Sequence, residues 1–237
     1  VRQFTELLTR AGGFTPRIKV DSRKGDVCLV TDATLKSEAY KLEITIKKIT
    51  IRASDLQGFY YALQSIRQLL PSAIESEQVT ENVDWTVPAL TITDQPRFGY
   101  RGLLVDVARF FSPKENLLRI IDCMAMLKLN KLHLHLVDDN GWRIEIKKYP
   151  KLTEIGSQRS RTVIGRNTQE YDNTPYGGFY TQEEAKEIVK YAQERYITII
   201  PEVDLPGHML AALAAYPEMG CTGGPYEGCP RWGGFED

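Results

Sequence analysis

The sequence has few of the residues that would suggest a redox, metal-dependent or membrane protein. It contains four cysteines and three histidines among 237 residues, and four cysteines do not make a disulfide scaffold at this size. No apolar run approaches the ~20 residues that a membrane span needs. Lys and Arg (30) nearly balance Asp and Glu (31), so the net charge favours neither nucleic acid nor an anionic membrane as a partner.

What is present is ordinary for a folded globular chain. Hydrophobic residues make up 42% of the sequence and charged residues 26%, which gives no reason to expect disorder. The length is sufficient for one large domain, or for a small domain and part of a second one.

Residues 1–93 have the pattern of a small α+β domain. Alternation of apolar and polar residues predicts short strands over residues 26–30, 40–46 and 49–52. Ser54-Asp-Leu-Gln57 has the spacing of a capping box and predicts a helix that ends before Pro71. Residues 71–96 contain Val-Pro and Gln-Pro steps typical of a linker, so we place a domain boundary near Asp94.

Residues 94–237 change to alternating strands and helices. Strands are predicted over residues 100–107, 131–137 and 197–203, and helices start after the capping sequences at Ser112 and Thr181. Strands rich in Leu, Ile and Val between helices are typical of a parallel sheet that is buried on both faces. Three such strands cannot close an eight-stranded barrel, so this second domain is predicted to be an incomplete α/β fold.

Polar side chains follow all three predicted strands. The segments are RGLLVDVAR over residues 101–109, HLHLVDDNGW over 133–142 and ITIIPEVDLPGH over 197–208. Carboxyl ends of parallel strands meet at one edge of a sheet, where α/β enzymes bind their ligands. The pattern therefore predicts an enzyme with one polar pocket.

Two groups in these segments are the best candidates for chemistry. Asp138 and Asp139 are adjacent carboxylates at a strand end, where one can be kept available for proton transfer; the alternative is that both cap the following turn. His208 follows a Pro-Gly turn that directs its imidazole, and the alternative is a structural histidine. Arg101 begins a strand and could make forked contacts to hydroxyls or a carboxylate.

Other side chains have a structural explanation. Asp106, Arg109 and Asp204 are expected to form an internal ion-pair lattice, and Glu202 and Asp204 to support the site. Cys28 and Cys123 are expected to be buried thiols, whereas Cys221 and Cys229 could close a small disulfide in an oxidising compartment.

His133 and His135 must be considered as a metal pair, with His208 as a third ligand. A strand places both imidazoles on one face, which suits a metal-dependent barrel hydrolase. The same alternation puts them on the face opposite Asp138 unless the strand bends. We therefore expect no metal site.

Taken together, the three polar segments resemble the β-N-acetylhexosaminidases of glycoside hydrolase family 20 in order and spacing. The resemblance covers residues 95–220, and the preceding unit is similar to the small α+β domain that precedes the (β/α)8 barrel of that family. It implies an exo-acting glycosidase that removes terminal N-acetylglucosamine or N-acetylgalactosamine without a cofactor. In this family the 2-acetamido group of the substrate attacks the anomeric carbon.

The resemblance also implies roles for single residues. Arg101 would hold hydroxyls of the terminal sugar, and Asp138 and His208 would form a hydrogen-bonded network that tunes the general acid. Substrates would be oligosaccharides or glycoconjugates that end in an N-acetylhexosamine, and the enzyme would be secreted, periplasmic or lysosomal. The choice between gluco and galacto substrates and the oligomeric state stay open.

One expected motif is missing. The catalytic Asp-Glu pair of the family lies in a Gly-Gly-Asp-Glu strand, and this sequence has no such motif. The chain is therefore expected to be the N-terminal portion of the enzyme, with three strands of the barrel, and to be inactive alone. A rival interpretation is a carbohydrate-binding relative that lacks the catalytic strand.

Overall fold

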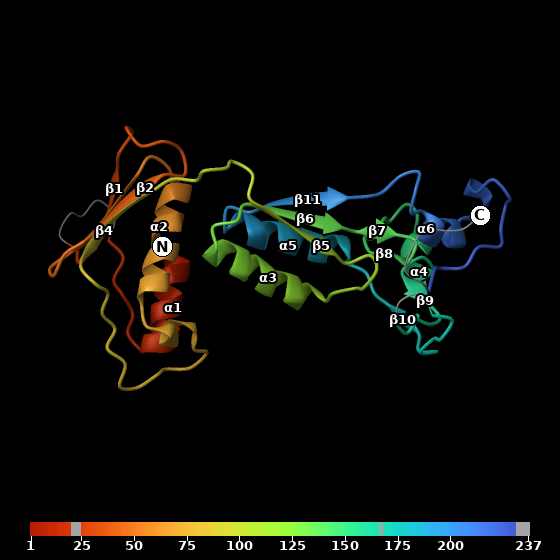
Figure 1. The fold of residues 1–237 in the computed structure, drawn as a ribbon, viewed down its shortest axis with the longest axis horizontal. Helices are drawn as coiled ribbons and strands as arrows, with labels where there is room; N and C mark the ends of the chain where they lie inside the picture. Colours follow the sequence, from red (N-terminus) through yellow and green to blue (C-terminus); the bar gives the residue numbers. More distant parts are fainter. Residues whose placement is uncertain (20–24, 166–167, 231–237) are drawn as a thin grey trace. The chain divides into compact units, whose positions relative to one another are not determined.

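The structure is a computed structural model that describes residues 1–19, 25–165 and 168–230 (Figure 1). The chain forms two compact units. The first unit comprises Val1–Gly99 with Met126–Lys128, and the second comprises Tyr100–Ala125 with Leu129–Asp237. No helix within the described ranges has the length and apolar character that a membrane crossing requires.

The first unit contains a four-stranded sheet and two α-helices. Its elements are α1 (Arg2–Gly12), β1 (Val27–Thr31), β2 (Tyr40–Ile44), β3 (Ile49–Ala53), α2 (Leu56–Leu69), a 3-10 turn (Ser72–Glu75) and β4 (Leu90–Asp94). The strand order is β1-β3-β2-β4, in which β1 and β3 are parallel and the other pairs are antiparallel. Figure 1 shows α2 against one face of this sheet.

The core of this unit lies between the sheet and α2. The inward residues of β2 and β3 pack against α2 residues at helical spacing, and the buried set is Tyr40, Leu42, Ile44, Ile51, Ala53, Tyr61, Ala62, Leu63 and Ile66. The alternation read from residues 40–46 therefore corresponds to a real buried face, because successive strand residues point to opposite sides.

Two expectations for this unit are wrong in detail. Residues 71–96 are not only a linker, because β4 pairs along its whole length with β2. The prolines at positions 88 and 96 flank this short strand and give the segment the sequence pattern of a linker. The second error concerns the start of α2, where Asp55 rather than Ser54 is the N-cap.

Asp55 is the cap because its carboxylate reaches three donors. It accepts hydrogen bonds from the Gly58 amide (2.7 Å), the Glu38 amide (2.9 Å) and the Ser37 hydroxyl (2.7 Å). Ser54 instead donates to the carbonyl of Lys36 (3.0 Å). The cap thus also ties α2 to the loop that precedes β2.

We expect Asp55→Ala to destabilise this unit by about 1–2 kcal/mol, because loss of an N-cap side chain typically costs that much. Ser54→Ala is the matched control and should change stability by less than about 0.5 kcal/mol. Hydrogen exchange of α2 amides measures the effect in this unit alone. Equal effects of the two substitutions would contradict the assignment of the cap.

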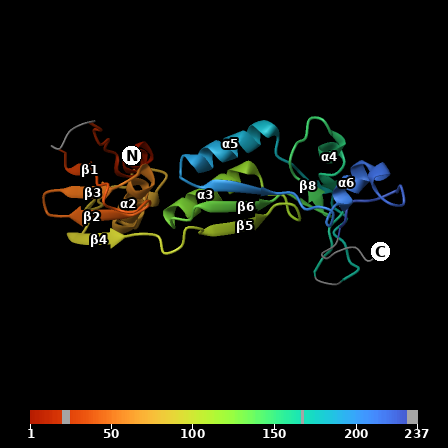
Figure 2. The same cartoon turned by 90° about the horizontal axis from the view of Figure 1, so that it is seen from above.

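The second unit is built on three parallel strands. These are β5 (Gly102–Asp106), β6 (Lys131–His135) and β11 (Thr198–Glu202), in the order β11-β6-β5. Helices α3 (Lys114–Met126) and α5 (Gln182–Gln193) connect them and lie on one face of the sheet (Figure 2). The predicted capping box of α5 is confirmed, since Thr181 and Glu184 bond each other's backbone amides.

Shorter elements follow the carboxyl ends of β6 and β11. They are β7 (Val137–Asp138), β8 (Gly141–Trp142), α4 (Lys151–Glu154), β9 (Gln158–Arg159), β10 (Tyr176–Gly177), α6 (Leu210–Ala215) and a 3-10 turn (Pro217–Met219). Strands β7 and β8 form a hairpin, and β9 pairs with β10 in antiparallel fashion. This end of the sheet therefore carries the irregular structure in which α/β folds place their sites.

The four cysteines are free thiols. Cys28 is buried as expected, but Cys123 is exposed, because the buried stripe of α3 runs through Leu117, Ile121 and Met124. Cys221 and Cys229 are not joined to each other.

Candidate functional site

The three parallel strands end at the same level. Residue pairing places Asp106 opposite His135, and His135 opposite Glu202. Their last residues therefore form a row of acid, base and acid across the sheet. Parallel pairing explains this row, because strands in register that run the same way must deliver their final side chains to one edge.

The chain bends after β6. His135 ends β6, and the next hairpin places Asp138 opposite Gly141. Strict alternation would put His135 and Asp138 on opposite faces, but Nε2 of His135 lies 2.9 Å from Oδ2 of Asp138. The chain bends between β6 and β7, which is the condition under which alternation no longer separates His135 from Asp138.

Asp138 is the centre of the cluster. Its side chain is 2% exposed, and Oδ2 also pairs with Nη2 of Arg109 at 2.7 Å. Oδ1 accepts a hydrogen bond from the amide of Asp139 at 2.7 Å. A carboxylate removed from water needs such partners, and Asp138 has a cation, an imidazole and an amide.

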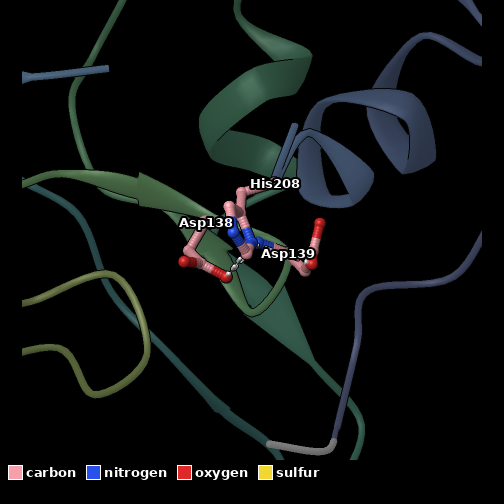
Figure 3. Close-up of side chains that lie close together, drawn as sticks. All are labelled: Asp138, Asp139 and His208. Atoms are coloured by element: carbon pink, nitrogen blue, oxygen red, sulfur yellow. Dashed lines mark hydrogen bonds and ion pairs between the residues drawn. The ribbon is translucent and has the colours of Figure 1, made fainter. Parts of the chain in front are cut away.

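His208 lies beside both aspartates (Figure 3). Its Nδ1 is 3.3 Å from Oδ2 of Asp139, with hydrogen-bond geometry, and 3.4 Å from Oδ1 of Asp138. Its backbone is left-handed, with φ of 55°. The side chain is 39% exposed, and Nε2 has no partner among the described residues, so this nitrogen can meet a further group.

Asp139 holds the segment that carries His208. Its Oδ1 accepts a hydrogen bond from the amide of Leu210 (3.1 Å), at the start of α6. Its carbonyl accepts from the amide of Cys229, and the side chain of Asn140 donates to the carbonyl of Cys229. The sequence prediction of a catalytic role for Asp138 and a supporting role for Asp139 stays a prediction, but the two side chains and His208 do lie together.

The guanidinium of this site comes from Arg109. Its Nη1 pairs with Oδ2 of Asp106 at 2.7 Å while Nη2 pairs with Asp138. The other oxygen of Asp106 accepts from the amides of Ala108 and Arg109. Neighbouring carboxylates outweigh burial and raise the pKa of Arg109.

Arg101 lies at the amino end of β5. It precedes β5, and its backbone bonds Asn130 at the amino ends of β5 and β6. Five residues of strand separate it from Asp106, which corresponds to about 16 Å at 3.3 Å per residue. The backbone of Arg101 thus lies at the other end of β5 from the cluster, and its role as a contact to hydroxyls of the terminal sugar stays a prediction.

The supporting acids differ from each other. Glu202 lies between two imidazoles, with Oε1 3.0 Å from Nδ1 of His135 and Oε2 against Nε2 of His133. Asp204 has no hydrogen bond or ion pair in the described part of the chain, so the expected lattice contains Asp106 and Arg109 without Asp204.

A buried arginine connects the loops around the cluster. Arg143 is fully buried and donates to carbonyls of four segments: Val107 and Ala108, Asn140, Ser157, and Gly178. Burial lowers the pKa of Arg143 to about 10, so it stays charged near neutral pH. No motif or spacing in the sequence points to this role of Arg143.

Arg159 supports the Arg109 loop from the other side. Its Nη1 donates to the carbonyl of Arg109 at 2.6 Å. Its guanidinium lies 4.5 Å from the ring centre of Tyr176 and 5.0 Å from that of Phe110. Desolvation lowers the pKa of Arg159. Cation–π contacts of this kind are favourable.

The geometry does not favour the metal alternative. His133 and His135 share Glu202, whereas the described residues that approach one another closely enough to hold an ion together are Asp138, Asp139 and His208. Their oxygens already accept hydrogen bonds, and Arg109 places a positive charge on Asp138. A second cation would have to displace these partners.

The protein has an α/β fold with a buried cluster of carboxylates and imidazoles at the carboxyl ends of its parallel strands. This is the place at which enzymes of the α/β class have their active sites. The model of the glycosyl hydrolase family 20 catalytic domain matches residues 98–233, and the model of domain 2 of that family matches residues 1–95. The chain belongs to glycosyl hydrolase family 20. The resemblance of its motifs to that family is thereby confirmed.

Individual relatives agree. A β-hexosaminidase of Porphyromonas gingivalis is 46% identical over 209 residues, which cover 87% of this chain and 25% of the relative. A β-hexosaminidase of Vibrio furnissii is 42% identical over 198 residues, covering 84% and 31%. The chain thus spans about a quarter to a third of the length of these curated relatives.

A solved structure has the same fold. A mutant Streptomyces plicatus β-hexosaminidase in complex with the product GlcNAc superposes with a TM-score of 0.87 at 36% identity, covering 98% of this chain and 44% of that one. The predicted fold class, a small α+β domain followed by part of a barrel, is confirmed.

Proposed function

We propose that this chain forms the first part of an exo-β-N-acetylhexosaminidase that removes terminal N-acetylglucosamine or N-acetylgalactosamine. The observation that carries the proposal is the cluster of Asp138, Asp139 and His208 at the strand ends of a family 20 chain. Relatives named β-hexosaminidase and a neighbour that holds GlcNAc support the substrate class.

The role of the chain's own residues follows from their contacts. Nδ1 of His208 faces Asp139 and Asp138, which leaves Nε2 to contact a general acid supplied by a further part of the polypeptide. The two carboxylates orient the imidazole, and Nε2 can then exchange a proton with that general acid during the reaction. The attack itself would be made by the 2-acetamido group of the substrate, as in the family.

The arginine proposed to contact substrate is Arg101, which stands in the segment RGLLVDVAR, whose motif resembles that of the family. Its planar guanidinium can make forked contacts to hydroxyls of the terminal sugar.

The proposal predicts different activities for two proteins. The full-length protein that contains this sequence should hydrolyse aryl N-acetyl-β-glucosaminides or galactosaminides, whereas the 237-residue chain should show no turnover. An aryl β-glucoside is the matched control substrate, because its 2-hydroxyl cannot replace the acetamido nucleophile.

Release of the aryl group, followed by absorbance, is the measurement. Turnover by the 237-residue chain would contradict the need for residues outside it. Equal turnover of the glucoside would contradict substrate assistance, and binding of N-acetylglucosamine without turnover by the full-length protein would favour the carbohydrate-binding alternative.

A further inference from the structure

His135 has a carboxylate on each ring nitrogen. Nε2 lies 2.9 Å from Oδ2 of Asp138, and Nδ1 lies 3.0 Å from Oε1 of Glu202. The imidazole is buried, with 8% of its side chain exposed. It therefore bridges β7 and β11 through two polar contacts, of which the one to Asp138 is buried on both sides and the one to Glu202 is partly exposed.

The two contacts restrict the proton content of the ring. A neutral imidazole has a single N–H and can donate to one carboxylate, whereas the imidazolium donates to both. Ionised carboxylates only accept hydrogen bonds. Both contacts are hydrogen bonds only when both ring nitrogens of His135 carry a proton.

The charges around His135 favour that state. The groups that face it or its carboxylate partners come from the three strand ends, the hairpin and the loops that follow: Asp106, Arg109, His133, Asp138, Glu202 and His208. Burial by itself would lower the pKa of His135, but the hydrogen bonds to Asp138 and Glu202 outweigh it and raise the pKa.

Asp138 depends on this imidazole for its orientation. His135 and Arg109 both hold Oδ2, which leaves Oδ1 turned toward His208. We propose that His135 is a positioning residue, which as an imidazolium keeps Asp138 ionised and turned toward His208. The effect of this positioning on catalysis rests on the proposed function.

His135→Gln in the full-length protein tests the role. Glutamine removes the positive charge, and a misplacement of about 1 Å in a site can cost about 100-fold in rate. We expect kcat to fall by about that factor with little change in KM. A carboxylate that loses a neighbouring cation is protonated at higher pH, so the acid limb of the pH profile should move up by about one pH unit.

His133→Gln is the matched control. His133 lies two residues away on β6 and contacts Glu202, but it has no contact with Asp138. We expect the acid limb of the pH profile of the His133→Gln variant to stay in place. An unmoved limb in His135→Gln, or equal shifts in both variants, would overturn the proposal.

A second measurement does not need activity. In 15N-histidine NMR of the full-length protein, His135 should titrate above pH 6.5, and Asp138→Asn should lower its midpoint by about one unit. An unchanged midpoint overturns the coupling to Asp138. If the parent protein hydrolyses no N-acetylhexosaminide, the proposed function fails while this titration still decides the role of His135.

Discussion

Replacing Arg143 by methionine should lower the free energy of unfolding of the second unit by about 4 kcal/mol. The guanidinium donates to five carbonyl groups in a dry interior, and buried acceptors that lose their donors cost about 1–3 kcal/mol each before relaxation. Methionine fills a similar volume but donates no hydrogen bond. Urea unfolding followed by hydrogen exchange of β5 and β6 amides would measure the loss.

Arg161→Met is the matched control for this substitution. Arg161 is exposed and stacks on Tyr171 with 4.0 Å to the ring centre, so its loss should cost less than about 1 kcal/mol. Arg143→Lys should lie between the two, because an ammonium keeps the charge but cannot reach four segments. A cost below about 1 kcal/mol for Arg143→Met would show that the carbonyls find other donors.

The second large effect is expected for Asp138→Asn in the full-length protein. Asparagine keeps the shape but removes the negative charge that faces Arg109, His135 and His208. A role in the proton-transfer network is typically worth about 10²–10⁴-fold, so we expect kcat/KM for an aryl N-acetylglucosaminide to fall about 1000-fold. Steady-state kinetics at several pH values would measure it.

Asp122→Asn provides the comparison. Asp122 pairs with Arg195 through Nε at 2.6 Å on the outer side of the second unit, and surface ion pairs contribute little. This variant should retain its activity. If Asp138→Asn keeps a tenth or more of the parent activity while its circular dichroism spectrum is unchanged, the cluster is not part of the catalytic machinery.

Periodicity and spacing were sufficient for much of the fold. The parallel strands, the helices between them and the polar groups at their ends follow from local alternation and from capping sequences such as that at Thr181. The proximity of Asp138 to His208 also follows, because both come after strands of one parallel sheet.

The remaining parts of the fold and of the candidate site depend on positions at which the chain departs from regular secondary structure. Alternation separates His135 from Asp138, and only the bend at Leu136 brings them together. Arg143 acts through backbone carbonyls, which exist at every position and leave no trace in the sequence.

The strands of the second unit lie along the sheet in the same order as in the chain, β5 then β6 then β11. A sheet with this order can be extended from one edge, because each further βα unit lies beside its predecessor and no earlier strand has to be displaced. Paired residues are 29 positions apart for β5 and β6 (Gly102 with Lys131) and 67 apart for β6 and β11 (Lys131 with Thr198), and the entropy cost of closing such loops rises only slowly with their length. The strand ends that bear Asp106, His135 and Glu202 would then come together stepwise, and the cluster would be complete only after the last of the three has docked.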